Sequence, residues 1–281
     1  MSDPNPTDVD PAERASVAER AAKAGSDVGL KWFRERLDVD TKTGPTDYVT
    51  KADRGSQERI VEVIRDDYPD DVIVAEEGTA RKTLPAEGTA WLVDPIDGTF
   101  EFVRGLPLWA VSVACVRDGE PVAAVNALPA LDELYVAANA AATTYSFVDG
   151  NAATVDGTPA SVSERDDAET FAAGIIDWHD FDADEPSTGL VRGFAERFGE
   201  VRRLGSSQTT LTYVASGALD VAVSTNPNPW NNVAGAHLIA RAGGTVTDAE
   251  GRPWKPGAEY LVASNGTAHD VVLETVGNHR P

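Results

Sequence analysis

The 281-residue chain has little cysteine, few basic residues and no long apolar run. Its single cysteine, Cys115, excludes an intramolecular disulfide framework and any zinc site built from several cysteines. Cys115 lies in the apolar run 110–116, which predicts a buried strand thiol rather than a nucleophile. No apolar run approaches the ~20 residues that cross a bilayer, and residues 1–11 are polar and acidic, unlike a signal peptide. We therefore expect a soluble protein of the cytoplasm.

Basic residues are scarce: 24 Lys and Arg stand against 46 Asp and Glu, which gives a net charge of −22. A polyanion of this kind repels nucleic acids and anionic membranes, so we expect neither as a partner. The acidic residues are spread along the chain rather than gathered in a tail. This pattern is typical of a halophilic protein, because a high-salt cytoplasm screens most of the repulsion between like charges.

The order of apolar runs and turn residues predicts an α+β protein in two halves that meet near Gly150. Residues 1–150 hold two helices, of which the first spans about 11–37, and an antiparallel meander of strands between 109 and 148. Residues 151–281 alternate strands and helices in the manner of an α/β domain. No internal repeat or low-complexity linker separates the halves, so we expect them to share one interface and one cleft.

The segment 94–99, Asp-Pro-Ile-Asp-Gly-Thr, is the centre of the predicted site. It follows the apolar run 91–93, which we interpret as the end of a buried strand, and it contains turn-forming proline and glycine. Two carboxylates, Asp94 and Asp97, at the end of such a strand need a compensating cation, because burying like charges together is unfavourable. An ordinary Asp-Pro and Asp-Gly surface turn is the alternative, and this motif alone does not decide between them.

Other polar groups are delivered at strand ends or helix starts elsewhere in the chain. They are Lys42, Asp53, Glu76, Thr99, Gly205, Ser206, Ser207 and Asn231. Oxygen ligands without His or Cys select a hard cation, Mg²⁺ or Mn²⁺, and several carboxylates can hold two or more ions. Such a centre suits attack of a metal-activated water on a phosphate, with Glu76 and Thr99 suited to orienting and deprotonating the water. A helix start at 205–207 presents free backbone N–H groups to an anion or hydroxyl.

Five segments in order resemble the inositol monophosphatase family, which belongs to the Mg²⁺-dependent, lithium-sensitive sugar phosphatases. They are 47–53 (Asp-Tyr-Val-Thr-Lys-Ala-Asp), 75–77 (Ala-Glu-Glu), 94–99, 205–206 (Gly-Ser) and 230–235 (Trp-Asn-Asn-Val-Ala-Gly) with the Ala-Gly-Gly at 242–244. The resemblance covers about residues 11–278 and extends to archaeal members of the inositol monophosphatase and fructose-1,6-bisphosphatase type. It implies a layered αβαβα sandwich and a homodimer.

The resemblance also implies roles for individual residues. The implied metal ligands are Glu76, Asp94, Ile96 through its carbonyl, Asp97 and Asn231. The implied catalytic residues are Glu76, Thr99 and Asp53, with Asp53 supporting Thr99 as it helps to activate the water. The implied substrate contacts are Gly98, Thr99, Lys42, Gly205, Ser206 and Ser207. Most of the metal ligands thus come from residues 1–150, and residues 151–281 complete the cleft.

Three positions depart from the family pattern. Asn231 stands where the family has a ligand Asp; it keeps a carbonyl oxygen and the ability to cap a helix but loses the charge, so further ions should bind more weakly. Two roles remain open for Asn231: it caps the helix without binding a metal ion, or it caps the helix and also binds the ion. Ser224 stands where animal inositol phosphatases have a substrate-binding Glu, and Glu101 adds a charge beside the site. The change at Ser224 favours broad specificity.

We therefore predict a Mg²⁺-dependent phosphomonoesterase of a small sugar or polyol phosphate, with inositol 1-phosphate and fructose 1,6-bisphosphate as the main candidates. A 3′-phosphoadenosine 5′-phosphate phosphatase is an alternative within the same class. The alternative from another class is a degenerate homologue that binds ligand or metal without turnover and acts as a regulatory or structural dimer. Asn231 motivates this second alternative.

Overall fold

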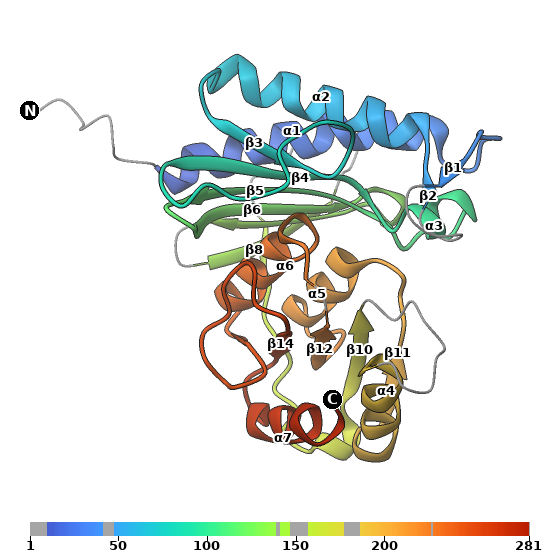
Figure 1. Ribbon diagram of the computed structural model, residues 1–281, viewed down its shortest axis with the longest axis vertical. Coiled ribbons are helices and arrows are strands. Elements are labelled where there is room, and N and C mark those ends of the chain that lie inside the picture. The colour runs from blue at the N-terminus through green and yellow to red at the C-terminus, as the bar shows by residue number, and fades with distance from the viewer. Residues whose placement is uncertain are drawn as a thin grey trace, which may run out of the picture.

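The computed structural model describes residues 10–41, 48–138, 141–146, 157–176, 186–225 and 227–280. Within these residues the main elements form five layers, in the order helices, sheet, helices, sheet and helices (Figure 1). This arrangement agrees with the predicted αβαβα sandwich. No helix in the described part of the chain is long and apolar enough to cross a membrane.

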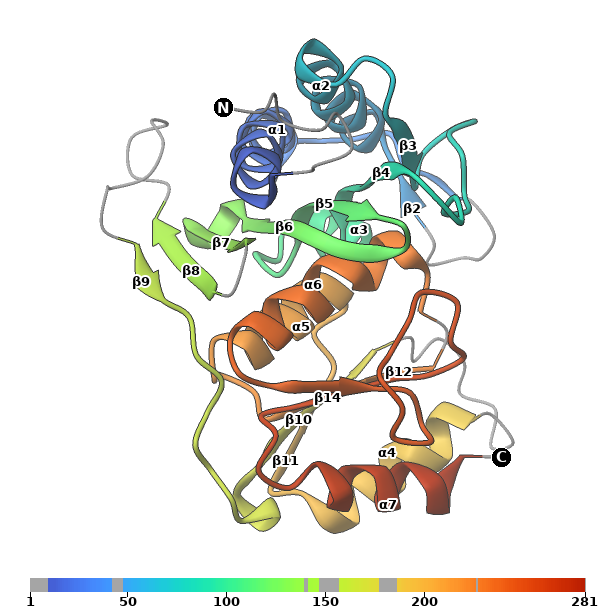
Figure 2. The same ribbon diagram turned by 90° about the vertical axis from the view of Figure 1, so that its left-hand side faces the viewer.

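The first layer holds α1 (Pro11–Trp32) and α2 (Lys51–Asp67), which pack against each other and cover one face of the first sheet (Figure 2). Asp10 caps α1, because its Oδ1 accepts the backbone N–H of Ala12 at 2.8 Å. We predicted that the helix continues to about residue 37, but it ends at Trp32. The chain leaves helical geometry at Phe33, where ψ is 126°, and Arg34 then has a φ of 65°.

The second layer is a seven-stranded sheet with the order β3-β4-β5-β6-β7-β8-β9. Its strands are β3 (Val72–Ala75), β4 (Thr89–Asp97), β5 (Ala110–Arg117), β6 (Glu120–Leu128), β7 (Glu133–Ala138), β8 (Ala141–Ser146) and β9 (Thr158–Pro159). β3 and β4 run parallel. β5 to β8 form the predicted antiparallel meander, and β4 and β9 extend it by one antiparallel strand at each end. The prediction that the central strand ends at Val93 is wrong. β4 continues to Asp97, because β5 still pairs there after an irregular register between Asp94 and Asp97.

The third layer holds α5 (Ser207–Ala215) and α6 (Pro229–Arg241), which lie between the two sheets (Figures 1 and 2). Leu211 of α5 belongs to one apolar cluster with Leu92 of the first sheet and Leu261 of the second. The two halves of the chain therefore share a core, and this core fixes the starts of α5 and α6 against the end of β4.

The fourth layer is a five-stranded sheet with the order β11-β10-β12-β14-β13, and α4 and α7 cover its outer face. These elements are β10 (Ala172–Ile176), β11 (Glu200–Arg202), β12 (Val221–Ser224), β13 (Thr245–Thr247), β14 (Leu261–Ser264), α4 (Pro186–Arg197) and α7 (His269–His279). Outside the layers lie β1 (Asp40–Thr41), β2 (Tyr48–Val49) and the short turns η1 (Pro129–Leu131) and η3 (Ala168–Thr170). The division near Gly150 stays a prediction; β9 follows it in the chain but pairs with β8 of the first sheet.

Candidate active site

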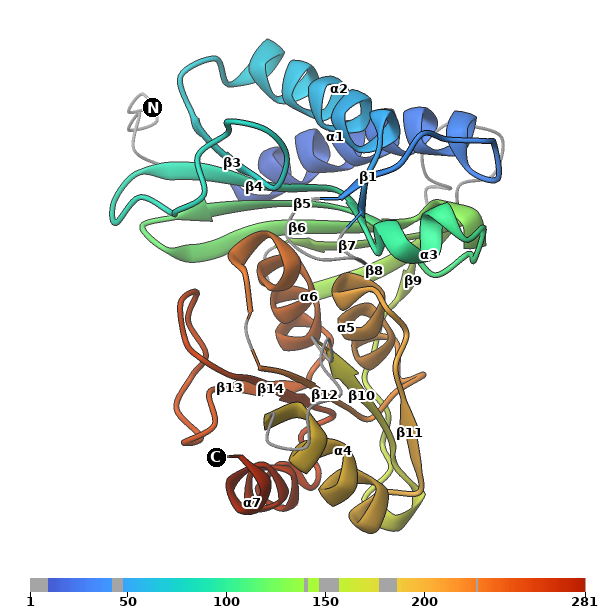
Figure 3. The ribbon, with the colours of Figure 1, turned by 45° about the vertical axis from the view of Figure 1, so that its right-hand side comes forward.

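Most of the predicted site residues lie where β3 and β4 end, beside the starts of α3 (Thr99–Val103), α5 and α6 (Figure 3). The residues at these ends are Glu76, Asp94, Ile96, Asp97, Gly98, Thr99, Gly205, Ser206, Ser207 and Asn231. Asp53 reaches the same place from the first turn of α2. Lys42 is outside the described residues, so its place near the cleft stays a prediction.

The end of β4 buries both aspartates of the central motif: Asp94 is 1% exposed and Asp97 is 5% exposed. The chain then turns at Gly98, where φ is 89°. A β-carbon at Gly98 would lie 2.9 Å from Cβ of Ser206 and 3.1 Å from the carbonyl oxygen of Leu108. Glycine at this position therefore allows the starts of α3 and α5 to approach each other closely.

Asp97 is bound by the N-terminal end of α5. Ser206 donates its hydroxyl to Oδ2 of Asp97, and Gln208 donates its backbone N–H to the same oxygen at 2.7 Å. Burial raises the pKa of Asp97 above its usual range; these two donors oppose the change, and the charge of Glu76 adds to it. Asp97 is therefore a buried carboxylate whose charge the protein compensates only in part.

The polar groups at the helix start 205–207 form hydrogen bonds to other groups of the protein. Ser206 caps α5, because its Oγ accepts the backbone N–H of Thr209 at 3.0 Å while its hydroxyl hydrogen goes to Asp97. Ser206 and Ser207 are 2% and 7% exposed. Their substrate contacts stay a prediction.

Glu101, the acid that departs from the family pattern, lies against the same helix start. A side chain at Gly205, where φ is 79°, would collide with the Glu101 carboxylate. Oε2 of Glu101 is buried and has no hydrogen-bond partner within the described ranges. Burial raises the pKa of Glu101, and the charge of Arg203 opposes this. The additional charge thus lies within the wall of the site rather than in solvent.

Asp53 and Thr99 contact each other directly. Oγ1 of Thr99 lies 3.0 Å from Oδ1 of Asp53 and 3.0 Å from the carbonyl oxygen of Ile96. Oδ2 of Asp53 accepts both the backbone N–H of Thr50, at 2.7 Å, and the Thr50 hydroxyl, at 2.6 Å. This is the capping box of α2. Burial raises the pKa of Asp53, and these hydrogen bonds oppose the rise. The cap fixes one oxygen of Asp53 and leaves the other to hold Thr99.

Lys82 is a candidate site residue that the sequence does not signal, since a lysine in the loop after β3 fits no motif. Its Nζ donates to the carbonyl oxygens of Ala75, at 2.8 Å, and of Glu76, and lies 5.6 Å from the centre of the Trp230 ring. Lys82 therefore connects the end of β3 to the first turn of α6.

Asn231 lies in the first turn of α6 but does not cap it. The N-cap is Asn228, so the prediction that Asn231 caps the helix is wrong. The helix begins earlier because Pro229 occupies its first position, where the fixed φ of proline suits a helix. Oδ1 of Asn231 is buried and has no hydrogen-bond partner in the described part of the chain. A buried carbonyl oxygen without a donor is suited to binding a cation.

The donor atoms gathered here fit a hard cation. They are buried carboxylate oxygens, the Ile96 carbonyl and Oδ1 of Asn231, all of them oxygen ligands of the kind that Mg²⁺ takes. Over the described residues, no three His, Cys, Asp or Glu side chains are close enough together to enclose an ion. Individual carboxylates face hydrogen-bond donors instead, as Asp97 faces Ser206 and Gln208.

Comparison with known proteins gives a consistent result. A family model described as "Inositol monophosphatase family" matches residues 10–280. A fructose-1,6-bisphosphatase/inositol-1-monophosphatase of Thermotoga maritima is 35% identical over 255 residues, which cover 90% of this chain and 91% of the relative. A histidinol-phosphatase of Chlorobaculum parvum is 32% identical over 272 residues, covering 92% and 95%. A Nus factor SuhB of Pasteurella multocida is 31% identical over 270 residues, covering 95% of each.

Solved structures have the same fold. The IMPase of Thermotoga maritima has a TM-score of 0.80 at 31% identity, covering 95% of this chain and 97% of the other. The inositol monophosphatase of Anabaena has a TM-score of 0.81 at 26% identity, covering 96% and 97%. These likenesses confirm the predicted fold class. From the family match over nearly its whole length, the chain belongs to the inositol monophosphatase family of phosphatases.

Proposed function

We propose that the protein is a Mg²⁺-dependent phosphomonoesterase that acts on small sugar or polyol phosphates. The observation that supports this most directly is the Thr99–Asp53 contact of 3.0 Å at the end of the strand that carries Asp94 and Asp97. A hydroxyl held by a carboxylate base lies there beside buried oxygen ligands. This combination is suited to metal-assisted hydrolysis of a phosphate.

The proposed metal ligands are Glu76, Asp94, the carbonyl of Ile96, Asp97 and Asn231, of which Asn231 is neutral. Mg²⁺ is the proposed ion and Mn²⁺ the alternative, because all of these ligand atoms are oxygens. When bound, the ion would polarise the phosphate and lower the pKa of a water molecule.

The proposed roles of the protein's own groups follow from their contacts. Asp53 accepts the hydroxyl hydrogen of Thr99, which leaves an oxygen lone pair of Thr99 to accept a hydrogen bond from the attacking water. The pKa of Asp53 is raised by burial, which makes it a stronger base than an exposed aspartate. Glu76, whose charge acts on both Asp53 and Asp97, orients the same water. The backbone N–H groups of Gly98 and Thr99 bind the phosphate.

Relatives suggest the candidate substrates. Their names point to inositol 1-phosphate, fructose 1,6-bisphosphate and histidinol phosphate, and 3′-phosphoadenosine 5′-phosphate is a further alternative. Ser224, at the end of β12, is fully buried and short. This supports broad specificity rather than a contact made only with inositol.

Release of inorganic phosphate from these four compounds, measured in high salt with and without Mg²⁺, tests the proposal. We expect Mg²⁺-dependent turnover of at least one sugar or polyol phosphate, and loss of this turnover in Asp94→Asn. A wild-type protein that is no faster than Asp94→Asn on every compound would show that it is not such an enzyme.

A second candidate function is that of a regulatory homologue that binds ligand or metal but has lost catalysis. Asn231 supports it, because the site has one charge fewer than the family pattern, and relatives named Nus factor SuhB suggest roles beyond phosphatase activity. Asn231→Asp separates the candidates. Phosphate release by Asn231→Asp but not by the wild type identifies the native chain as the degenerate form.

We further propose a cytoplasmic homodimer adapted to high salt. The net charge of −22 supports the salt adaptation, because counterions screen the repulsion within the folded chain, and the family resemblance supports the dimer. Analytical ultracentrifugation across a salt series tests both. A protein that stays folded and monomeric in dilute buffer contradicts both.

A further inference from the structure

Gln208, in the first turn of α5, bonds to three other elements. Its backbone N–H donates to Oδ2 of Asp97 at 2.7 Å. Its side-chain Nε2 donates to the carbonyl oxygen of Trp230 at 2.8 Å. Its Oε1 accepts from Asn126 Nδ2 at 2.8 Å and from the backbone N–H of Gly235 at 2.9 Å. One residue thus joins the ends of β4, β6 and α6.

Three of these hydrogen bonds are buried, and the one to the Trp230 carbonyl is partly buried. Gln208 and Asn126 are both 0% exposed. Asn126 Nδ2 also lies 2.9 Å from the hydroxyl oxygen of Thr212, so the network extends along α5. A buried amide group that loses its hydrogen-bond partner is destabilised by its full desolvation penalty. The network therefore holds the groups that it joins in fixed positions.

Two of the groups that Gln208 binds belong to, or directly precede, candidate metal ligands. Its backbone N–H holds the side-chain carboxylate of Asp97 itself. Its side-chain amide holds the backbone carbonyl of Trp230, the residue directly before Asn231. Oδ1 of Asn231 is buried without a hydrogen-bond partner among the described residues, so its own side chain does not fix its position through that atom.

We propose that Gln208 is a positioning residue that sets the distance between Asp97 and Asn231 and thereby the affinity of the site for a divalent cation. The inference rests on the proposed metal-dependent function. Outer-shell hydrogen bonds of this kind change metal affinity by about 10- to 100-fold when they are removed. Asn231 has no charge, so it can contribute to cation binding only through the dipole of its amide oxygen. That contribution depends more strongly on where the oxygen lies than the contribution of a charged carboxylate does.

Mn²⁺ binding without substrate tests this role, with free Mn²⁺ followed by electron paramagnetic resonance. The test variant is Gln208→Met, which keeps the length and volume of the side chain but removes its hydrogen bonds. The matched control is Thr212→Val, which removes a hydrogen bond from the same network without changing the link to Trp230. We expect the dissociation constant for Mn²⁺ to rise about tenfold in Gln208→Met and less than about twofold in Thr212→Val.

A second background shows whether Gln208 acts through Asn231. In Asn231→Ala, the group that Gln208 positions is gone, so adding Gln208→Met should change the Mn²⁺ dissociation constant less than about twofold. Equal tenfold losses in both backgrounds overturn the proposal, because Gln208 then acts elsewhere. A folded Gln208→Met with wild-type Mn²⁺ affinity overturns it as well.

Two further outcomes are distinguishable. If circular dichroism shows that Gln208→Met does not fold, Gln208→Asn replaces it, since an asparagine side chain is one methylene too short to hold the Trp230 carbonyl; the same tenfold criterion applies. If the wild type binds no Mn²⁺ while folded, the proposed metal-dependent function fails together with this inference. If the wild type binds Mn²⁺ and the variants do not differ from it, the inference about Gln208 alone fails.

Discussion

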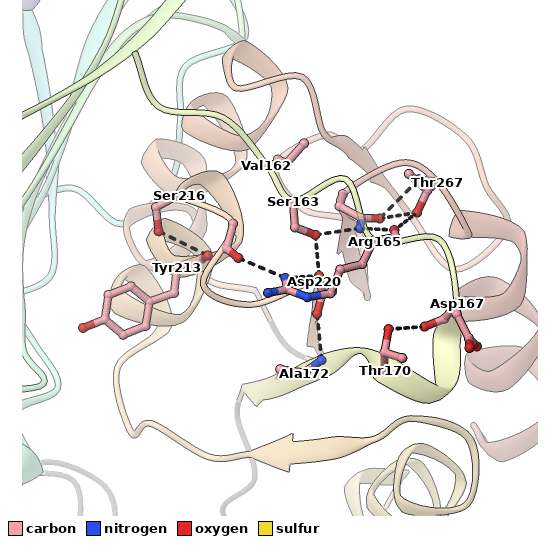
Figure 4. A network of polar contacts seen from close by, with 12 residues as sticks. Val162, Ser163, Arg165, Asp167, Thr170, Ala172, Tyr213, Ser216, Asp220 and Thr267 are labelled. Carbon is pink, nitrogen blue, oxygen red and sulfur yellow. Dashed lines mark hydrogen bonds and ion pairs between the residues drawn. The ribbon is translucent and has the colours of Figure 1, made fainter. Parts of the chain in front are cut away.

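Two buried aspartates, Asp97 in the candidate site and Asp220 in the second half of the chain, are held by similar donors but differ in how their charge is compensated. Asp220 is 1% exposed and accepts the hydroxyl of Ser163, the backbone N–H of Ala172 at 2.8 Å and Nη1 of Arg165 at 3.1 Å (Figure 4). The guanidinium of Arg165 makes the last contact an ion pair. Asp220 therefore joins its own segment to the segments of Ser163–Arg165 and of Ala172. Arg165 supplies the positive charge that compensates the Asp220 carboxylate.

Asp97 also accepts a serine hydroxyl and a backbone N–H, from Ser206 and Gln208. In the part of the chain that the structure describes, however, no Lys or Arg forms an ion pair with it, and Glu76 adds a second negative charge to its surroundings. Hydrogen bonds are thus common to both aspartates, whereas the internal cation is present at only one. We propose that this difference separates a carboxylate that stabilises the fold, Asp220, from one that can bind a cation from solution, Asp97.

The largest expected effect concerns Asp97. Asp97→Asn keeps a carbonyl oxygen for the donors Ser206 and Gln208 but removes the charge, so we expect phosphate release to fall by roughly a thousandfold, about 4 kcal/mol. The unfolding temperature should stay unchanged or rise, because burial disfavours the carboxylate. Steady-state kinetics and calorimetry measure the two quantities. Unchanged turnover with a large loss of stability would make Asp97 a structural residue like Asp220.

The contrast also explains which parts of the site could be predicted. Asp94, Asp97 and Thr99 lie in one short segment, so local sequence gives their chemistry and the strand before them gives their burial. The family resemblance extends this to the layered fold, which is confirmed. The end of β4 was predicted wrongly, because Pro95 and Gly98 suggest a turn while pairing with β5 continues to Asp97.

Contacts between distant segments could not be predicted. Gln208 is 111 residues from Asp97 in the chain, and only the packing of α5 against β4 brings them together. The position of Asn231 in α6 depends on Pro229 starting the helix, which places the N-cap at Asn228 rather than at Asn231. The link from Lys82 to Trp230 likewise depends on tertiary structure, because neither residue has a local pattern that indicates the other.

His237 provides a third kind of buried titratable group, one that stays uncharged. It is 5% exposed on α6, and burial, with a smaller contribution from the charge of Arg241, lowers the pKa of His237 from 6.5 to about 4. Between these values the unfolded chain binds the proton and the folded chain does not. The free energy of unfolding should therefore fall by about 3 kcal/mol as the pH drops from 6.5 to 4. Above pH 6.5 His237 is neutral in both states, and this loss of stability is absent.

His237→Leu isolates that contribution from the carboxylates that titrate in the same range. We expect the difference in unfolding free energy between wild type and His237→Leu to change by about 3 kcal/mol between pH 7 and pH 4. Denaturant unfolding at several pH values measures it. Parallel pH profiles of the two proteins would mean that His237 gains a proton in the folded state as easily as in the unfolded state.

Asp220→Asn should have a smaller effect, and on stability rather than on the site. The change weakens the ion pair with Arg165 and the charge-assisted bonds from Ser163 and Ala172, which we expect to lower the free energy of unfolding by about 2 kcal/mol. The side chain of Arg165 is 49% exposed, so solvent screens part of the ion pair. Mn²⁺ affinity should not change. A variant that loses Mn²⁺ affinity while its stability is unaffected would remove the distinction between the two aspartates.

The smallest expected effect is at Asn231. Adding a negative charge there tests whether the start of α6 can bind a cation in the way proposed for the carboxylates at the end of β4. Asn231→Asp should bind Mg²⁺ about tenfold more tightly, or about 1.4 kcal/mol, because ligand charge raises affinity for a hard cation. The same change should lower stability in the absence of divalent ions, since it adds a carboxylate at a position where the Asn231 oxygen is buried and has no hydrogen-bond partner among the described residues. Saturating Mg²⁺ should reverse that loss.

Asn232→Asp is the matched control, because it adds the same charge one residue away. Asn232 is 1% exposed, and its Nδ2 donates to the carbonyl oxygen of Asn228 at 3.1 Å, so its amide nitrogen stabilises the start of α6. Its Oδ1, like that of Asn231, is buried without a hydrogen-bond partner among the described residues, which makes the two positions comparable. Isothermal titration calorimetry with Mg²⁺ should show tighter binding for Asn231→Asp and not for Asn232→Asp. Equal gains in both variants would mean that the site responds to net charge alone and that Asn231 does not direct an oxygen at the ion.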